Sequence, residues 1–416
     1  MSNFDLPSQF EIQSMEIEGN DISALFVSLS VFENLFSPIV SGQITLLETD
    51  EARFIEKNQI EGSEEFKFQI KSAEESYKFD GFLNGLRNKE NSSQSTMYVF
   101  DFTSKELRKN EEKFISKAYK EKNPKEIVSE MIKEMDGKEE KVNGQGKPMT
   151  YIVPRKRPWE VIKYVLRKGV VSKANASEGD IDTVEEEAKG VGGFLCWNTQ
   201  KGFRFASIKD TIDGSAGTDA GEFTLETQNK GNSVSELMKS IIAYDFMIMG
   251  DIQAKQRSGA FKSIHISFDI DKAHYKEYEF ENEEMMTDKQ KKAVEKPSRI
   301  FAAPFSNERF ENKPQKAKQS KYDQRRYYMQ QSPGGENTFD DIQGSLTLFP
   351  QLKMMAGDTL QCKIYRTQGS KGGGMDRKHS GKYVIQEVAH HFTANDNKAY
   401  TRVTVIRSTK QQKDGQ

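Results

Sequence analysis

Hydrophobic and polar residues alternate through the first quarter of the chain with the two-residue period of half-buried strands. Three runs carry the pattern: Leu25, Val27 and Leu29 opposite Phe26, Ser28 and Ser30; Phe66, Phe68 and Ile70; and Tyr98, Phe100 and Phe102. Turn residues separate such runs at Glu61-Gly62, at Asp80-Gly81 and from Asn88 to Ser93. Short strands at this spacing predict an antiparallel barrel or sandwich over residues 1–112.

Two helices are predicted after this β segment. Asn123, a proline at the first helical position and Glu126 form a helix start, and Asp136-Gly137 forms its stop. A second helix is predicted from Pro158, with a stop at Gly169. Trp159 is interpreted as a core anchor of this helix, the alternative being a ligand contact.

Two apolar runs, Gly193–Trp197 and Phe203–Ile208, flank turn residues at Asn198–Gly202 and predict a β-hairpin. Together with the two helices, the hairpin predicts a small α+β domain over residues 113–229.

Strand-like patterns resume after a short helix near Val234 and continue, with one interruption, to the end of the chain. The runs are Tyr244–Met249, Ile264–Ile270, Gly344–Pro350, Thr359–Tyr365, Tyr383–Phe392 and Tyr400–Ile406. In residues 281–339 the pattern gives way to prolines and basic residues, which predicts an extended arm or insertion. We therefore expect a discontinuous second β domain, 230–280 plus 340–409, and a mobile tail, 410–416. The expected fold class is β-rich α+β, with two antiparallel barrel-like domains and a small α+β domain between them.

Length and composition limit the kinds of function that the chain can have. The chain of 416 residues has room for roughly two to four domains. Its 61 Lys and Arg against 63 Asp and Glu give a net charge of −2, which argues against a protein that coats nucleic acid. Cys196 and Cys362 are the only cysteines, so buried thiols are expected rather than disulfides or a zinc site. No secretory signal and no run of the ~18 apolar residues of a membrane span are seen, so we expect folding in a cytoplasm without stable membrane insertion.

No catalytic, cofactor or metal site is predicted. Gly381-Lys382 lacks the spacing of a phosphate-binding loop, and Tyr383 stands where Ser or Thr is needed. His390 and His391 are adjacent on a predicted strand, so their side chains should point to opposite faces. Because the carboxylates are scattered and neither cysteine has a nucleophile motif, the sequence gives little support to an enzyme.

The segment Lys318–Tyr328 is the best candidate for a contact surface. Its end, formed by Arg325, Arg326, Tyr327 and Tyr328, combines residue types that are frequent at interface hot spots. The alternative is a solvated helix or linker with no partner.

Three passages resemble the central hub proteins of T-even-like contractile phage baseplates, in the family shared with type VI secretion spike proteins. They are Ala243–Phe246 after a helix, the helix–hairpin passage Pro158–Ile208, and Lys382–His391 leading to Tyr400–Val405. The resemblance is spread over most of the chain, in short pieces without a catalytic fingerprint. The segment Lys289–Gln331 departs from the family pattern.

This resemblance implies two tube domains per subunit and a homotrimeric ring with pseudo-sixfold symmetry. Such a ring would act as a symmetry adaptor between the tail tube and the cell-puncturing spike, and its lumen would let the genome pass during ejection. The implied partners are the other two subunits, the spike, tube or tube-initiator proteins, other baseplate proteins and, transiently, DNA. The protein would belong to the virion tail and assemble in the host cytoplasm.

Three alternatives stay open. One is a hub component of a related contractile injection or secretion system. A second, from another class, is a tail-associated cell-wall hydrolase, which peptidoglycan turnover would reveal. A third is a nucleic-acid-binding module that uses Lys313–Tyr328, which would show salt-sensitive DNA binding.

Overall fold

The computed structural model of the chain describes residues 6–49, 53–73, 75–92, 94–146, 148–169, 171, 193–225, 234–248, 252–259, 261–269, 274–281, 292, 294–305, 342–365, 374–376 and 378–407. Its strands are β1 (Glu11–Ile17), β2 (Asn20–Asp21), β3 (Phe26–Asn34), β4 (Ser41–Thr49), β5 (Glu65–Ser72), β6 (Glu75–Asn91), β7 (Ser95–Ser104), β8 (Ile115–Lys122), β9 (Glu139–Val142), β10 (Met149–Lys156), β11 (Phe194–Thr199), β12 (Gly202–Ser207), β13 (Asp219–Leu225), β14 (Ile241–Ile248), β15 (Lys262–Asp269), β16 (His274–Glu281), β17 (Arg299–Phe305), β18 (Ile342–Leu348), β19 (Thr359–Ile364), β20 (Gly381–Thr393) and β21 (Lys398–Arg407). Its helices are α1 (Phe54–Lys57), α2 (Glu106–Glu112), α3 (Pro124–Glu134), α4 (Pro158–Lys168), α6 (Ile208–Asp213), α7 (Val234–Leu237) and α8 (Ile252–Ser258), with a 3₁₀ helix at Ser23–Leu25. Strands predominate, and the predicted β-rich α+β class is confirmed.

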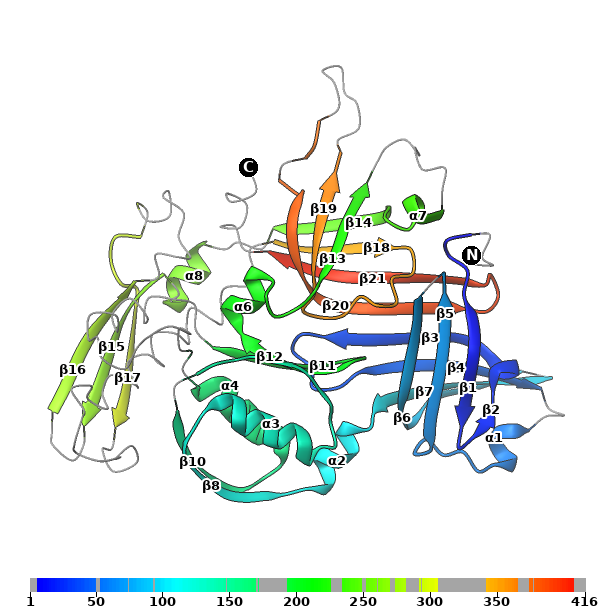
Figure 1. Cartoon of the computed structure of the whole chain (residues 1–416), viewed down its shortest axis with the longest axis horizontal. Coiled ribbons are helices and arrows are strands. Elements are labelled where there is room, and N and C mark those ends of the chain that lie inside the picture. The colour runs from blue at the N-terminus through cyan, green and yellow to red at the C-terminus, as the bar shows by residue number, and fades with distance from the viewer. Residues whose placement is uncertain are drawn as a thin grey trace.

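One 13-stranded sheet runs through the N-terminal and C-terminal parts of the chain. Its main path is β14-β18-β21-β20-β3-β4-β7-β6-β5-β1-β2, and β19 joins it through β20 and also carries β13. The link between the two parts is the antiparallel pairing of β20 with β3, in which His391 lies opposite Ser30. In Figure 1 the red C-terminal strands accordingly lie beside the blue N-terminal ones. The two β segments predicted from the sequence are therefore hydrogen-bonded to each other.

The N-terminal β segment has the core that its alternation predicts, with one correction. Phe66 to Ile70 on β5 and Tyr98 to Phe102 on β7 place their apolar residues inside. The alternation predicted for Leu25 to Ser30 is wrong at its start. Leu25 ends a 3₁₀ helix, and an irregularity between Phe26 and Ser28 allows both Phe26 and Leu29 to reach the core.

The turn predicted at Asp80-Gly81 is also wrong, because β6 is a single strand of 17 residues that continues to Asn91. The strand has a glycine at position 81 because a Cβ atom there would collide with the Thr103 carbonyl and with the Phe79 ring. A glycine in a strand interior often marks such a close approach.

Both predicted helices form in residues 113–229, which we call the middle segment. In α3, Asn123 caps the helix by accepting a hydrogen bond from the Lys125 amide at 3.0 Å. In α4, Trp159 packs against the middle core as predicted. The predicted hairpin is β11–β12, but its turn is tighter than expected, since Thr199 already pairs with Gly202.

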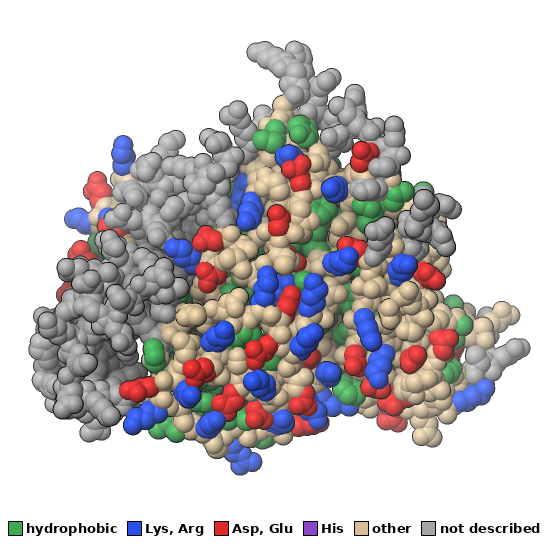
Figure 2. Space-filling view, in the orientation of Figure 1, with side chains coloured by type: hydrophobic (Ala, Val, Ile, Leu, Met, Phe, Trp, Pro, Cys, Tyr) green, Lys and Arg blue, Asp and Glu red, His purple; other side chains and the backbone are tan. Residues whose placement is uncertain are grey.

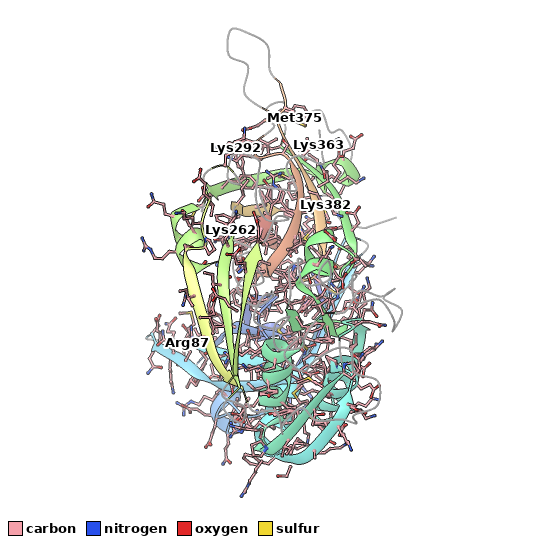
Figure 3. All side chains as sticks on the ribbon, turned by 90° about the vertical axis from the view of Figure 1, so that its left-hand side faces the viewer. Arg87, Lys262, Lys292, Lys363, Met375 and Lys382 are labelled. Atoms are coloured by element: carbon pink, nitrogen blue, oxygen red, sulfur yellow. The ribbon has the colours of Figure 1, made fainter. Side chains whose placement is uncertain are left out.

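The C-terminal strands form where they were predicted, and β14 pairs with β18 along its length. Two pairings differ from expectation. β13, from the predicted α+β segment, pairs with β19 of the large sheet. β15 and β16 leave that sheet and form a separate one with β17, a strand inside the predicted arm. Figure 3 shows this small sheet facing the viewer, with Lys262 on β15. The domain limits stay a prediction.

The surface mixes both signs of charge. On the face shown in Figure 2, basic and acidic side chains are interspersed over the middle segment, where Lys117 pairs with Glu130 and Lys122 with Glu126. Among the residues that the structure describes, no helix is long and apolar enough to cross a membrane.

Candidate functional site: a buried ionic junction

Arg204 is a charged side chain with no exposed surface. It lies in β12, where successive residues face opposite sides. Phe203 and Phe205 pack into the core of the middle segment, while Ala206 packs into a separate cluster with Trp197. Arg204 faces this second side, where the middle segment meets the large sheet.

The guanidinium of Arg204 binds two carboxylates that come from different parts of the chain. Its Nε and Nη2 donate to the Oε2 and Oε1 atoms of Glu140, on β9, at 2.6 and 3.0 Å. Its Nη1 donates to Oδ1 of Asp358 at 2.8 Å and to the Ala356 carbonyl at 3.2 Å. The two-pronged pair with Glu140 is a strong form of ion pair and joins β12 to β9. The bond to Asp358 joins β12 to the turn before β19.

Asp358 is held by donors on both of its oxygens. Oδ1 also accepts from the amide and the hydroxyl of Thr218, both at 2.8 Å, and Oδ2 accepts from the Met355 amide at 3.0 Å. The side chain of Asp358 therefore ties the start of β13 to the turn that precedes β19.

Glu33, on β3, extends the cluster into the N-terminal part of the sheet. Its Oε1 accepts from the Gln200 amide at 2.8 Å and from the Tyr77 hydroxyl at 3.3 Å. Its Oε2 accepts from the Ala356 amide at 3.3 Å. The Trp197 indole donates to the Ala356 carbonyl at 2.8 Å. We call Glu33, Glu140, Arg204 and Asp358 the ionic junction.

The environment shifts the titration of these groups in opposite directions. Burial disfavours the Glu140 carboxylate, but the bonds from Arg204 outweigh it and lower the pKa of Glu140. Burial likewise opposes the charge of Arg204, and Glu140 and Asp358 nevertheless raise its pKa. For Glu33 burial prevails over its hydrogen bonds and raises the pKa to about 7.

What this arrangement does is hold segments together. Its hydrogen bonds join residues from β3, β9, β12, the β11–β12 turn and the turn before β19. Buried ion pairs of this sort confer a defined geometry more than net stability. The junction thus joins the middle segment to β3 and to the turn before β19 of the large sheet.

The structure describes only some of the residues that were singled out in the sequence. The interface candidates Arg325, Arg326, Tyr327 and Tyr328 lie outside the described residues, so their role stays a prediction.

His390 and His391 do face opposite sides of β20. His390 is buried against the Tyr77 ring, and His391 bonds Ser30 at 2.8 Å. Cys196 and Cys362 are buried free thiols, as expected. Among the described residues, no group of three or more His, Cys, Asp or Glu is placed to hold a metal ion.

The junction residues themselves were missed, although two left a signal. Glu33 follows Leu29 and Val31 at two-residue steps, which places a carboxylate on the buried face of its strand. Arg204 stands in a strand whose six residues are all buried. An ionisable residue in such a position needs a partner, but the partner cannot be read from local pattern.

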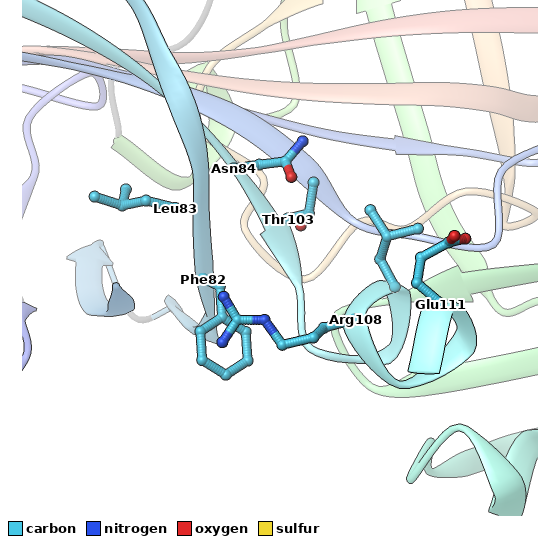
Figure 4. A pocket seen from close by; sticks show the side chains of 7 residues that line it. Phe82, Leu83, Asn84, Thr103, Arg108 and Glu111 are labelled. Atoms are coloured by element: carbon cyan, nitrogen blue, oxygen red, sulfur yellow. The ribbon is translucent and has the colours of Figure 1, made fainter. Parts of the chain in front are cut away.

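Two small hollows lie on the described surface of the N-terminal part. The first, of about 210 Å³, lies between β6, β7 and α2 and is shown in Figure 4. There the Arg108 guanidinium lies 3.7 Å from the centre of the Phe82 ring and donates to the Ser63 carbonyl. The second, of about 250 Å³, is lined in part by Arg87 and Asp101, which pair at 3.0 Å. Both are smaller than most ligand pockets.

Comparison with solved structures identifies the fold. A tail protein from Neisseria meningitidis MC58 superposes with a TM-score of 0.55 and 8% identity, covering 98% of this chain and 99% of its own. The 43 kDa tail protein of prophage MuSo2 from Shewanella oneidensis gives 0.54 and 8%, covering 97% and 99%. The chain has the fold of phage tail proteins. A component of the E. coli type VI secretion system has a TM-score of 0.45 and 10% identity, covering 97% and 78%.

The match to the tail proteins extends over nearly the whole of each chain, so the fold that the sequence resemblance implied is confirmed. At the level of sequence, no family model and no curated protein matches.

Proposed function

We propose that the chain is a structural subunit of a contractile phage tail, in the baseplate hub. The observation that carries the proposal is the likeness of fold to two tail proteins, end to end on both sides of each comparison. The continuous sheet and the ionic junction support it, because a subunit that transmits force benefits from parts that move together.

Three copies would form a ring with pseudo-sixfold symmetry, each giving two tube domains, 1–112 and 230–280 plus 340–409. Within the second range, the separate sheet that contains β15 and β16 would be an attachment to the tube domain. The antiparallel pairing of β3 with β20 supports this reading, since it places the N-terminal and C-terminal strands side by side in one sheet. Residues 113–229 would form the α+β domain outside the tube. A closed ring would also pair sheet edges that otherwise stay open.

The ring would join the tail tube to the cell-puncturing spike and let DNA pass through its lumen. A net charge of −2 suits such a passage, because a strongly basic lumen would retain the DNA. The other partners would be tube-initiator and further baseplate proteins, and Arg325, Arg326, Tyr327 and Tyr328 would contribute to one of these contacts. Assembly would take place in the host cytoplasm.

The test is the molar mass of the purified chain by light scattering, followed by electron microscopy of the same sample. We expect a mass of three subunits and a ring with six similar lobes around an open centre. A monomer that stays monomeric at high concentration and in the presence of its spike protein would contradict the proposal. Peptidoglycan turnover by the same sample would instead support the hydrolase alternative.

A further inference from the structure

The carboxyl group of Glu33 lies in an unusual position. It is 1% exposed, and it continues the inward-facing series of Leu29 and Val31 on β3. Its three hydrogen-bond donors come from three separate elements, namely Tyr77 on β6, the β11–β12 turn at Gln200, and the β18–β19 connection at Ala356. This one side chain therefore touches the N-terminal part, the middle segment and the C-terminal part of the molecule.

The charges that face Glu33 do not balance an ionised carboxylate. Arg204 is the buried cation of the site, and its hydrogen bonds go to Glu140, Asp358, the Ala356 carbonyl and the Met355 sulfur. A second cation, the exposed Lys201, acts on Glu140 from the surface. Glu140 and Asp358 already match and exceed the single charge of Arg204. An ionised Glu33 would add a third negative charge to a site from which water is excluded.

The other titratable groups next to Glu33 are uncharged. Tyr77 is a buried phenol whose pKa is raised well above its usual value by burial and by Glu33. The His390 ring packs edge-on against the Tyr77 ring, with 5.3 Å between the ring centres. Its Nδ1 atom shares a hydrogen bond with the Thr401 hydroxyl. Burial lowers the pKa of His390 to about 3, so this ring is neutral at physiological pH.

We propose that Glu33 is a proton-controlled lock on the ionic junction, closed when its carboxyl group is protonated and loosened when it is ionised. In the closed state the neutral carboxyl still accepts the two backbone amides, and its proton is shared with the Tyr77 hydroxyl. Loss of the proton to solvent leaves three carboxylates around one guanidinium, and their repulsion is relieved by separation of the three parts.

The direction of the pH effect follows from burial, which raises the pKa of Glu33 from 4.5 to about 7. In an unfolded chain Glu33 is ionised above pH 4.5, whereas in the fold it keeps its proton up to about pH 7. Folding therefore takes up a proton in this window. The contribution of Glu33 to stability is present below pH 4.5, declines as pH rises to 7, and then stays constant.

Two histidines, the buried His390 and the partly buried His391, oppose this effect in part of the window. The pKa of His390 and that of His391 are both lowered by burial, so acidification below about pH 6.5 destabilises the fold through them. The pH dependence of wild-type stability therefore combines two opposite effects. Stability is lost through Glu33 as pH rises and through the histidines as pH falls. The quantity that isolates Glu33 is the difference between the wild-type chain and a variant that cannot ionise at this position.

The experiment is urea unfolding of the full chain from pH 4.5 to 8, for the wild type, for Glu33→Gln and for Glu48→Gln. Glu48 is the matched control, since it is also buried and accepts from a tyrosine hydroxyl, that of Tyr98, and from a backbone amide. It lies away from the junction, on β4. We expect the unfolding constant of the wild type, relative to Glu33→Gln, to rise about 100-fold across this range. The Glu48→Gln chain keeps Glu33, so its unfolding constant relative to Glu33→Gln should rise as well.

A local probe reports the lock directly and covers the case in which Glu33→Gln fails to fold. Trp159→Phe leaves Trp197, whose indole binds Ala356 beside Glu33, as the sole tryptophan. Its emission in the folded chain should titrate near pH 7, together with the infrared band of a protonated carboxyl group. A wild-type chain without that band at pH 6, or a Glu33→Gln variant with the wild-type pH profile, would overturn the proposal.

Discussion

The guanidinium of Arg204 is fully buried, and it forms ion pairs with Glu140 and Asp358. Removal of one member of a buried ionic set leaves the others without a partner, which costs more than the set contributes as a whole. Arg204→Met keeps an apolar stem of similar length and removes only the charged group. We expect this variant to lose about 3 to 5 kcal/mol of unfolding free energy at pH 7 in urea titrations.

The control for this variant is Arg87→Met, on the exposed part of β6. Arg87 pairs with Asp101 at 3.0 Å, but its side chain is 61% exposed, so water competes for both charges. We expect little change in the urea midpoint. Similar losses in the two variants would mean that the junction contributes no more than a surface pair.

His390 illustrates the opposite case, a buried base that stays neutral. Its pKa of about 3 in the fold lies below the usual 6.5 because burial, and secondarily His391, disfavour the charged ring. The unfolded chain takes up a proton below pH 6.5 that the fold does not, so stability is present above pH 6.5 and lost as pH falls toward 3.

We therefore expect acidification from pH 7 to 4.5 to cost the wild-type chain about 2 to 3 kcal/mol more than His390→Gln. Glutamine preserves a polar group that can reach Thr401 but does not titrate in this range. The measurement is the unfolding free energy of both chains at each pH. Parallel profiles would show that His390 is charged in the fold or accessible to water.

Among the elements, β4 depends on a glycine near its start. Gly42 lies between Val31 of β3 and Phe102 of β7, and an added Cβ atom would collide with the Phe102 ring and the Ser30 carbonyl. Because one obstacle is backbone, the sheet must shift rather than a side chain turn. We expect Gly42→Ala to lower the unfolding free energy by at least about 2 kcal/mol in thermal or urea unfolding.

Gly374 provides the control for that substitution, since an added Cβ atom there meets nothing within 4 Å and its backbone is not in the left-handed region. Gly374→Ala should leave the midpoint nearly unchanged. If Gly42→Ala is equally harmless, the strands around β4 are looser than their register implies.

Element boundaries followed from local pattern where the cause is local. The Asn123 cap, the proline starts of α3 and α4, and the alternation along β5 and β7 all act within a few residues. Other failures arise from contact between distant segments. Gly81 resembles a turn residue, yet it lies mid-strand because β7 packs against it.

The same division holds for the candidate site. The inward position of Glu33 follows from its place after Leu29 and Val31. Its partners at Gln200 and Ala356 lie 167 and 323 residues away along the chain. No spacing rule connects them, so the junction became visible only in the folded structure.

At the scale of the whole molecule, the large sheet and the ionic junction connect three apolar cores. The N-terminal core, the middle core and the C-terminal core are separate clusters of side chains. Separate cores favour independent unfolding, whereas the β3–β20 pairing and the bonds of Arg204 favour a single transition. Which tendency prevails decides whether the subunit deforms at its joints or acts as one body.

The reaction rates of the two native cysteines report this balance, so no further cysteine has to be introduced. Cys196 lies in the middle core and Cys362 in the C-terminal core, and burial raises the pKa of Cys362 to about 12. Each thiol therefore reacts only when its own core opens. If the parts open together, the Cys196→Ala and Cys362→Ala chains should react with a thiol reagent at rates within about tenfold of each other in mild urea.

Arg204→Met should then separate the two rates, because it loosens the joint between these cores while leaving both apolar clusters intact. A large difference between the two thiols in the unsubstituted background would contradict the single-body expectation. It would favour domains that open independently, and a ring built from such subunits would yield at its internal joints before its subunits separate.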